Sequence, residues 1–181
     1  MLAISGSLRR DSRNGLLLRA AAELLPAGVE LELYDGLKDV PPYDPGDDVE
    51  PAPLPVAALR AAVAGADAVF FSTPEYNSSI PGALKNALDW ASRPLATNVF
   101  LNKPVAVIGS SAGRFGAVWA QAELRKVLAA MGARVVETEV AVGRSVEKFD
   151  TDGLLVDEET RRQLRDALAA LAAESAERPA A

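Results

Sequence analysis

The run Gly6-Ser7-Leu8-Arg9-Arg10-Asp11-Ser12-Arg13-Asn14 has side chains suited to a phosphate and precedes a stretch with helical spacing of apolar residues. Backbone N–H groups at the first turn of a helix bind anions, and the hydroxyls of Ser7 and Ser12 and the guanidinium of Arg9 would add donors. These groups suit a phosphate monoester. The other two arginines of the run, Arg10 and Arg13, are expected to be surface charges. Alternatively, Ser12 only caps the helix and all three arginines are solvated. The residues alone leave both interpretations open.

The same run differs from two common phosphate-binding motifs. It lacks the glycine spacing of the G-x-G-x-x-G loop and the G-K-[ST] ending of the Walker A loop. The sequence therefore gives no support to ATP use, or to a dinucleotide bound first through its pyrophosphate.

A second polar run, from Thr73 to Asn86, contains two prolines and a glycine. Such residues stiffen a loop, and a stiff loop holds its backbone polar groups in a fixed array that suits the edge of a flat heterocycle. Tyr76 could lie against such a ring or be an ordinary half-buried aromatic residue, and Asn77 could instead cap the next helix. Glu75 could act as a general base, but no partner stands near it in the sequence, so we expect a structural role.

The composition excludes many other kinds of catalysis. The chain has 181 residues and contains neither His nor Cys, which removes Ser-His-Asp triads, thiol nucleophiles, disulfides and the usual zinc ligands. It has 25 acidic and 19 basic side chains, a net charge of −6 and no Lys/Arg run, so we expect no nucleic-acid partner. An enzyme of this composition most simply takes its chemistry from a cofactor.

The length and hydropathy predict one globular domain over residues 1–181, with frayed last residues. No run reaches the ~18 apolar residues of a membrane span. An apolar run directly follows Met1 and leaves no room for the basic start of a signal peptide. We therefore expect a cytoplasmic protein with no membrane partner.

The elements that must position the polar runs alternate along the chain. Apolar runs indicate strands at 2–4, 29–34, 68–71 and 105–108, with a fifth strand within 134–142. Helical spacing of apolar residues indicates helices at 13–25, 54–64, 81–90, 117–131 and 158–173. The Pro- and Asp-rich run 35–55 is expected to be a loop.

Five strands alternating with five helices predict one parallel α/β sheet with helices on both faces. Two doubly wound arrangements fit, the flavodoxin-like order 2-1-3-4-5 and half of a Rossmann fold. In either arrangement ligands bind at the carboxyl ends of the strands, near the point where the strand order reverses. Both polar runs leave strands at that edge.

The two runs resemble the signatures of one protein family. Gly6-Ser7-Leu8-Arg9 with Ser12 and Asn14 resembles the GSLR-x-x-S-x-N loop of the NADPH-dependent FMN reductase family. PEYNSSIPGALKNALDW, from Pro74 to Trp90, resembles the second signature of that family. The resemblance implies the flavodoxin-like, doubly wound, five-stranded parallel sheet and the activities of bacterial flavin, quinone, azo and chromate reductases.

The resemblance also implies an FMN site built from three loops. Contacts to the FMN phosphate would come from Ser7, Arg9, Ser12 and Asn14. Contacts to the isoalloxazine ring, largely through backbone groups, would come from Pro74, Glu75, Tyr76 and Asn77. The other polar edge of the ring would meet a third loop, 110–116, at Ser110 and Gly113. That loop is otherwise a plain strand-to-helix turn that needs glycine at positive φ.

The reaction that the resemblance implies needs no catalytic side chain. NADPH or NADH would pass hydride to non-covalently bound FMN, and a flavin, quinone, azo or chromate-type acceptor would take it up in a ping-pong second half-reaction. Flavin sites of the family are usually completed by a second subunit, which implies a homodimer or homotetramer. Phe115 and Trp119 could form such an interface or close the core, whereas we expect Trp90 to be buried.

One departure from the family pattern and two other functions stay open. Trp119 stands where a basic residue is common, which leaves the NADPH preference and the assembly undecided. A flavodoxin-like electron carrier would bind flavin without using nicotinamide. A nucleoside deoxyribosyltransferase would use Glu75 as its nucleophile.

Overall fold

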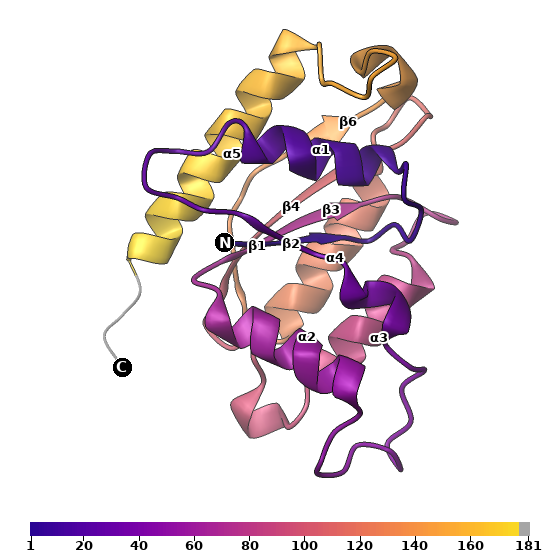
Figure 1. The fold of residues 1–181 in the computed structure, drawn as a ribbon, viewed down its shortest axis with the longest axis vertical. Coiled ribbons are helices and arrows are strands. Elements are labelled where there is room, and N and C mark those ends of the chain that lie inside the picture. The colour runs from indigo at the N-terminus through magenta and orange to yellow at the C-terminus, as the bar shows by residue number, and fades with distance from the viewer. Residues whose placement is uncertain (178–181) are drawn as a thin grey trace.

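A parallel sheet runs through the middle of the protein (Figure 1), and the computed structural model describes residues 1–177. Within that range the strands are β1 (Leu2–Ser5), β2 (Glu32–Tyr34), β3 (Val69–Thr73), β4 (Pro104–Ser110), β5 (Arg134–Val135) and β6 (Ala141–Val142). The order is β2-β1-β3-β4-β5, and β6 also pairs with β4. This confirms the flavodoxin-like order and rules out half of a Rossmann fold.

Helices cover both faces of the sheet (Figure 1). The helix α1 (Arg13–Ala22) and the helix α5 (Glu158–Ala176) lie on one face. The opposite face is covered by α2 (Leu54–Gly65), α3 (Gly82–Ala91) and α4 (Val118–Ala130). Single turns of 3-10 helix occur at η1 (Gly36–Asp39), η2 (Leu95–Thr97) and η3 (Ser145–Lys148).

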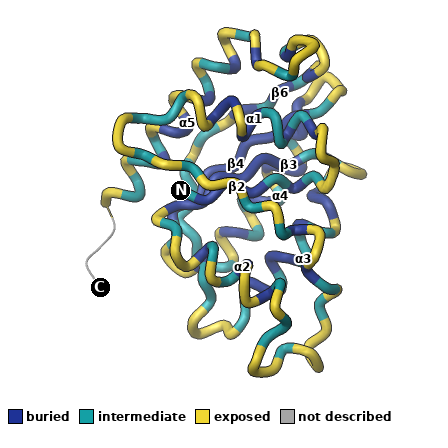
Figure 2. The backbone as a smooth tube through the Cα atoms, viewed as in Figure 1, coloured by how far each residue is buried: buried dark blue, intermediate teal, exposed yellow. Residues whose placement is uncertain are grey.

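Successive residues of the central strands point into two separate cores. Phe71 and Val107 pack with α2, α3 and α4, whereas their neighbours Phe70 and Ile108 pack with α1 and α5. Both β3 and β4 are buried along their whole length, as Figure 2 shows. Each large apolar side chain buried in this way contributes about 1.5–3 kcal/mol. The near-continuous apolar runs in the sequence are therefore those of strands covered on both faces.

Trp90 is fully buried, as expected, and it anchors the long loop 35–55. Its indole Nε1 donates to the carbonyl oxygen of Pro41 at 2.8 Å, and the ring of Tyr43 meets it edge-on at 4.9 Å. The Nδ2 of Asn86 donates to the same carbonyl at 2.8 Å. The loop therefore packs against α3.

The fifth strand, expected within 134–142, is interrupted. Val105 pairs with Val135 but Gly109 pairs with Ala141, so the outer segment has two residues more than β4 between these pairs. Extra residues cannot all pair with the neighbouring strand. The guanidinium of Arg125 fills the break by donating to the carbonyl oxygens of Val107 and Thr138. Burial lowers the pKa of Arg125.

Other element boundaries differ by a few residues. The helix expected at 13–25 ends at Ala22, and the loop expected at 35–55 contains η1 and overlaps the start of α2. The expectation of frayed last residues concerns 178–181, which lie outside the described residues.

Candidate functional site

The candidate site is the edge of the sheet where β1, β3 and β4 end. These strands are neighbours in the sheet, so the loops that follow them leave it side by side. They are the first loop (6–12), which leads to α1, the second loop (74–81), which leads to α3, and the third loop (110–116), which begins at the last residue of β4 and leads to α4. The residues predicted from the sequence for the cofactor lie in these loops, at the end of β4 or in the first turn of α1.

Asn14 forms hydrogen bonds to the ends of two neighbouring strands, β3 and β4. Its Oδ1 accepts hydrogen bonds from Ser72 Oγ at 2.8 Å and from Ser110 N at 3.0 Å, while its Nδ2 donates to the Ser110 carbonyl at 3.1 Å. All three residues are buried. The amide side chain therefore fixes the start of α1 against the ends of β3 and β4. The phosphate contact predicted for Asn14 stays a prediction.

The first loop keeps several donors free of protein partners. Ser12 caps α1 by accepting from Asn14 N at 3.2 Å, and the Ser7 Oγ accepts from Arg9 N at 3.4 Å. Among residues 1–177, no hydrogen bond involves the backbone N–H of Leu8. The same holds for the backbone N–H of Arg10, whereas the backbone N–H of Asp11 donates to its own carboxylate.

Two buried polar atoms beside the loops also lack a hydrogen-bond partner within the described range. They are the hydroxyl oxygen of Ser110 and the Nε of Arg13. Arg13 is half-buried, so the expectation that it is a plain surface charge is wrong. Buried polar atoms of native proteins are generally hydrogen-bonded, which makes these two atoms donors that a ligand could satisfy.

The charge at the tip of the first loop is shared between Arg9 and Asp11. The Arg9 guanidinium lies 3.2 Å from the Asp11 carboxylate, and both side chains are largely exposed. The hydrogen bond from Arg9 is the largest cause of the lowered pKa of Asp11. An exposed ion pair of this kind contributes little to stability, so Arg9 can exchange its partner for another anion.

The second loop is a tight turn with an unusual backbone. Tyr76 and Ser79 exchange two backbone hydrogen bonds of 3.0 and 3.1 Å. Asn77 and Ser78 between them have φ values of +51° and +59°, in the left-handed region that favours glycine. Such conformations cost free energy and cluster at binding sites. The two hydrogen bonds close the turn and set the directions of its backbone groups, while the stiffness expected from the prolines stays a prediction.

Glu75 caps a helix that begins more than forty residues later in the chain. Its Oε2 accepts from Trp119 N at 3.0 Å and from Ala120 N at 3.2 Å, in the first turn of α4. The residue before this helix, Ala117, provides no side-chain cap and has φ +61°. A carboxylate at a helix N-terminus satisfies free N–H groups and the helix dipole. The structural role expected for Glu75 thus has a definite partner.

The third loop packs closely on β6 and on the segment that follows it. A Cβ added to Gly116, which has φ +62°, would lie 2.3 Å from the Ala141 carbonyl carbon. The carbonyl oxygen of Gly116 accepts from the buried Gln121 Nε2 at 2.9 Å, and that of Gly113 accepts from Arg144 N at 2.8 Å. The loop is therefore held on both sides.

Phe115 and Trp119 form an exposed aromatic pair at the same edge. Their ring centres are 5.1 Å apart at 67°, and 56% of Phe115 and 48% of Trp119 are exposed. Tyr76, next to Glu75, is 54% exposed. Of the two interpretations open for Phe115 and Trp119, closing the core is therefore wrong for this chain taken alone.

Sequence reasoning missed several residues that shape the site. Ser72 stood unremarked at the end of an apolar run, and Gln121 and Arg144 gave no signal of their hydrogen bonds to the third loop. Their partners are distant or in irregular segments, so no local pattern marks them. Among residues 1–177 no helix is long and apolar enough to cross a membrane.

Comparison with known proteins agrees with this geometry. The family model described as NADPH-dependent FMN reductase matches residues 1–147. The chain is 41% identical over 174 residues to an NAD(P)H-dependent FMN reductase of Pseudomonas aeruginosa, covering 94% of this chain and 92% of that one. It is 39% identical over 163 residues to a 2-hydroxy-1,4-benzoquinone reductase of a Burkholderia species, covering 90% and 88%.

A solved structure is similar over nearly the whole chain. The flavoenzyme NAD(P)H:(acceptor) oxidoreductase FerB from Paracoccus denitrificans superposes with a TM-score of 0.88 and 35% sequence identity. The match covers 98% of this chain and 97% of that chain.

Proposed function

The chain belongs to the NADPH-dependent FMN reductase family and is an FMN-dependent NAD(P)H oxidoreductase, and on this premise we propose how its own residues serve that activity. The observation that carries the proposal is the convergence of three loops on one sheet edge, with Asn14 linking α1 to the ends of β3 and β4. When bound, FMN supplies the chemistry of accepting hydride from NAD(P)H and delivering electrons to the acceptor.

The first loop holds the FMN phosphate. Free backbone N–H groups of the first loop, just before α1, the hydroxyls of Ser7 and Ser12 and the exposed guanidinium of Arg9 form a set of donors suited to a phosphate dianion. In this arrangement Arg9 gives up its exposed ion pair with Asp11.

The second and third loops hold the edges of the flavin ring. Pro74, Glu75, Tyr76 and Asn77 present backbone groups whose directions are set by the turn and by the Glu75 cap on α4. Ser110 and Gly113 lie on the other side. The free hydroxyl of Ser110 and the exposed ring of Tyr76 are further groups of this chain that can meet the ligand.

Asn14 acts mainly as a positioning residue. Both ends of its amide are engaged with Ser72 and Ser110, so we expect it to set the distance between the phosphate loop and the ring-binding loops. A direct contact to phosphate remains open through the second hydrogen of its Nδ2.

The acceptor is a small flat molecule of the quinone or flavin class. An open strand-end edge flanked by exposed aromatic residues suits planar oxidants, and the relatives described above act on FMN and benzoquinone by name. Azo and chromate-type acceptors, and a cytoplasmic location, stay predictions.

A second copy of the chain covers the aromatic pair Phe115–Trp119. The pair lies at the start of α4, beside Tyr76 and the Glu75 cap, and leaves about half of each ring exposed. Exposed aromatic residues of this kind are typical of interface anchors. We expect a homodimer or homotetramer in which this face closes the site.

A visible spectrum of the purified protein, recorded before and after anaerobic addition of NADH or NADPH, tests the function. Flavin absorbance that bleaches with either nucleotide, and returns on addition of a quinone, is the expected result. Parallel initial-velocity lines would further support ping-pong exchange. Absence of flavin after soaking with FMN and desalting would overturn the proposal.

The same spectrum separates the two other functions. Flavin colour without bleaching by either nucleotide would favour an electron carrier. A nucleoside deoxyribosyltransferase would need a free Glu75 carboxylate, whereas one oxygen of this carboxylate already accepts two backbone hydrogen bonds.

A further inference from the structure

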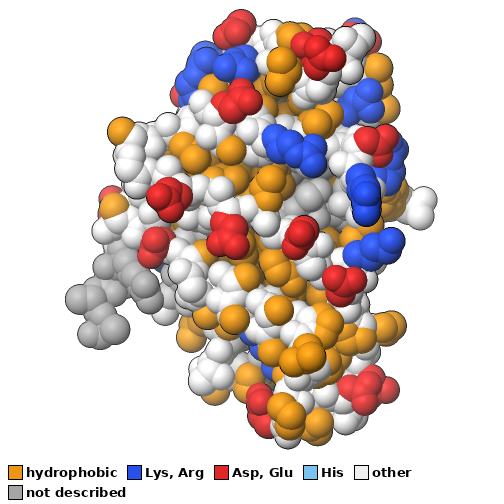
Figure 3. Space-filling model, viewed as in Figure 1, with side chains coloured by type: hydrophobic (Ala, Val, Ile, Leu, Met, Phe, Trp, Pro, Cys, Tyr) orange, Lys and Arg blue, Asp and Glu red, His pale blue; other side chains and the backbone are white. Residues whose placement is uncertain are grey.

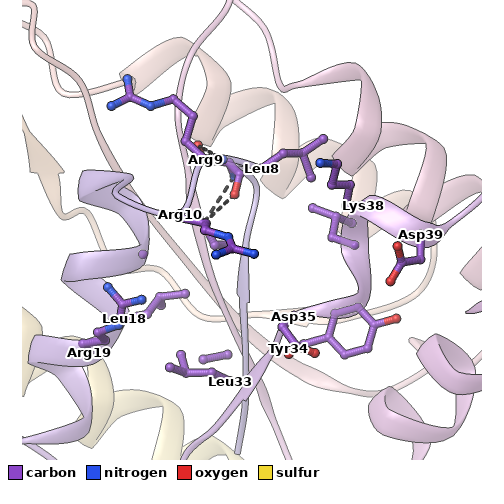
Figure 4. A pocket seen from close by; sticks show the side chains of 15 residues that line it. Leu8, Arg9, Arg10, Leu18, Arg19, Leu33, Tyr34, Asp35, Lys38 and Asp39 are labelled. Atoms are coloured by element: carbon purple, nitrogen blue, oxygen red, sulfur yellow. Dashed lines mark hydrogen bonds between the residues drawn. The ribbon is translucent and has the colours of Figure 1, made fainter.

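A groove adjoins the first loop on the side that faces the edge strand β2 (Figure 4). It encloses about 550 Å³ between the first loop, α1, the end of β2 and η1. This volume is in the range of small-molecule sites. Ser7 and Arg9 line it as well, so the groove continues directly from the residues proposed for the FMN phosphate.

Three cations without partners line the groove. Arg10 comes from the first loop, Arg19 from α1 and Lys38 from η1. Figure 4 shows Arg10 over the middle of the groove, with Arg19 on one side and Lys38 on the other. Within residues 1–177 none of these three side chains makes a hydrogen bond or ion pair, whereas that of Arg134, for example, pairs with Glu174 at 2.9 Å. In a chain of net charge −6, such a convergence of free cations favours an anionic ligand.

The rest of the lining is apolar surface and carboxylates. Leu18 and Leu33 are part of the apolar lining, and Leu33 is 44% exposed on the edge strand. Asp35 and Asp39 line the groove as well, and neither has an ion pair among the described residues. Burial, followed by the charges of Asp39 and Asp35, raises the pKa of Tyr34, whose hydroxyl thus stays a neutral donor. Figure 3 shows the same face, with basic and acidic side chains on either side of exposed hydrophobic ones.

These three kinds of group match the three parts of an adenosine phosphate. A purine base suits an apolar surface, the carboxylates can accept from its amino group or from ribose hydroxyls, and free cations suit a phosphate dianion. We propose that the groove binds the adenosine 2′-phosphate end of NADPH, with the phosphate against Arg10, Arg19 and Lys38. The proposal rests on the proposed function, because it makes this groove the donor subsite of the same reaction. The groove thereby selects NADPH over NADH.

Binding of adenosine 2′,5′-bisphosphate to the FMN-loaded protein, measured by calorimetry, tests the groove without turnover. The double variant Arg19→Ala/Lys38→Ala removes two cations that lie outside the FMN loops. We expect it to weaken this binding at least tenfold and to lower kcat/KM for NADPH at least tenfold, with kcat/KM for NADH changed less than twofold. Arg165→Ala, on the exposed face of α5, is the matched control and should change neither.

Two outcomes would overturn the assignment. One is a double variant whose kcat/KM falls equally for NADPH and NADH, or whose affinity for adenosine 2′,5′-bisphosphate equals that of the Arg165→Ala control. The other is apoprotein that binds FAD at least tenfold more tightly than FMN, with the difference lost in the double variant, because the groove would then take the adenylate of the cofactor. Failure of the proposed function is distinguishable, since it would appear as absent FMN binding or absent bleaching in the unmodified protein.

Discussion

The first loop and the third loop leave neighbouring regions of the same sheet edge, yet they are held very differently. The tip of the first loop is exposed, and its backbone N–H groups at Leu8 and Arg10 have no partner within residues 1–177. The third loop is fixed by a close backbone approach at Gly116 and by the Glu75 cap on the helix that follows it.

This difference matches the two parts of the proposed ligand. A phosphate supplies several strong acceptors of its own, so exposed donors can be hydrated by water in the free protein and exchange that water for the phosphate. A ring edge offers few polar atoms, and contacts to it gain from a backbone already held in place. The first loop thus stays available for the phosphate, whereas the third loop is fixed in place for the ring edge.

Gly116→Ala should have the largest effect on stability. A side chain at φ +62° with its Cβ 2.3 Å from the Ala141 carbonyl carbon forces the third loop away from β6, which should cost about 3 kcal/mol of unfolding free energy. Urea denaturation followed by circular dichroism measures the loss. Gly113→Ala is the control in the same loop, because its Cβ would have no atom nearer than 3.7 Å. Equal losses in the two variants would mean that the third loop is not held rigidly.

Asn14→Ala should lower the free energy of unfolding by about 2–3 kcal/mol, because it leaves buried groups of Ser72 and Ser110 without partners. Ser7→Ala, at a half-buried position of the first loop, should change the unfolding free energy by less than about 0.5 kcal/mol. Thermal unfolding of both apoproteins checks the pair. A small loss in the Asn14 variant, with FMN binding abolished, would instead favour direct contact to the phosphate.

Glu75→Gln should destabilise the protein by about 1 kcal/mol, because the charge at the N-terminus of α4 is lost while one acceptor oxygen remains. Glu123→Gln, on the exposed side of the same helix with only a 3.7 Å ion pair to Lys126, is the control. Chemical denaturation compares the two variants. No difference between them would show that the cap does not link the second loop to the third.

Arg9→Ala should have the smallest effect on stability and change the unfolding free energy by less than about 0.5 kcal/mol. The same variant should bind FMN about tenfold more weakly, because a charge-assisted contact to the phosphate is lost. Asp11→Asn should leave stability unchanged and tighten FMN binding, because the carboxylate competes for Arg9. Fluorescence titration of the apoproteins with FMN measures both. Weaker FMN binding in the Asp11 variant would mean that the ion pair positions Arg9 instead of competing for it.

The architecture followed from local patterns. The strands β3 and β4 were predicted because residues covered on both faces form continuous apolar runs, and the capped helix after the first loop followed from Ser12 and the spacing of Leu17 and Ala21. The interruption of the fifth strand was not foreseen. It depends on a register difference relative to β4 and on Arg125 from α4, and neither leaves a mark in the sequence of the strand.

The sequence by itself determined which segments form the strands, the helices and the three loops, because hydrophobic periodicity and turn residues act over a few neighbouring positions. Only the tertiary structure decided what those loops contact. Asn14 reaches Ser72 and Ser110, and Glu75 reaches the start of α4, across separations that no local pattern encodes. The groove likewise exists only because α1 and η1 bring Arg19 and Lys38 to opposite sides of β2. Such contacts depend on strand order and register, which bring distant residues within hydrogen-bonding distance.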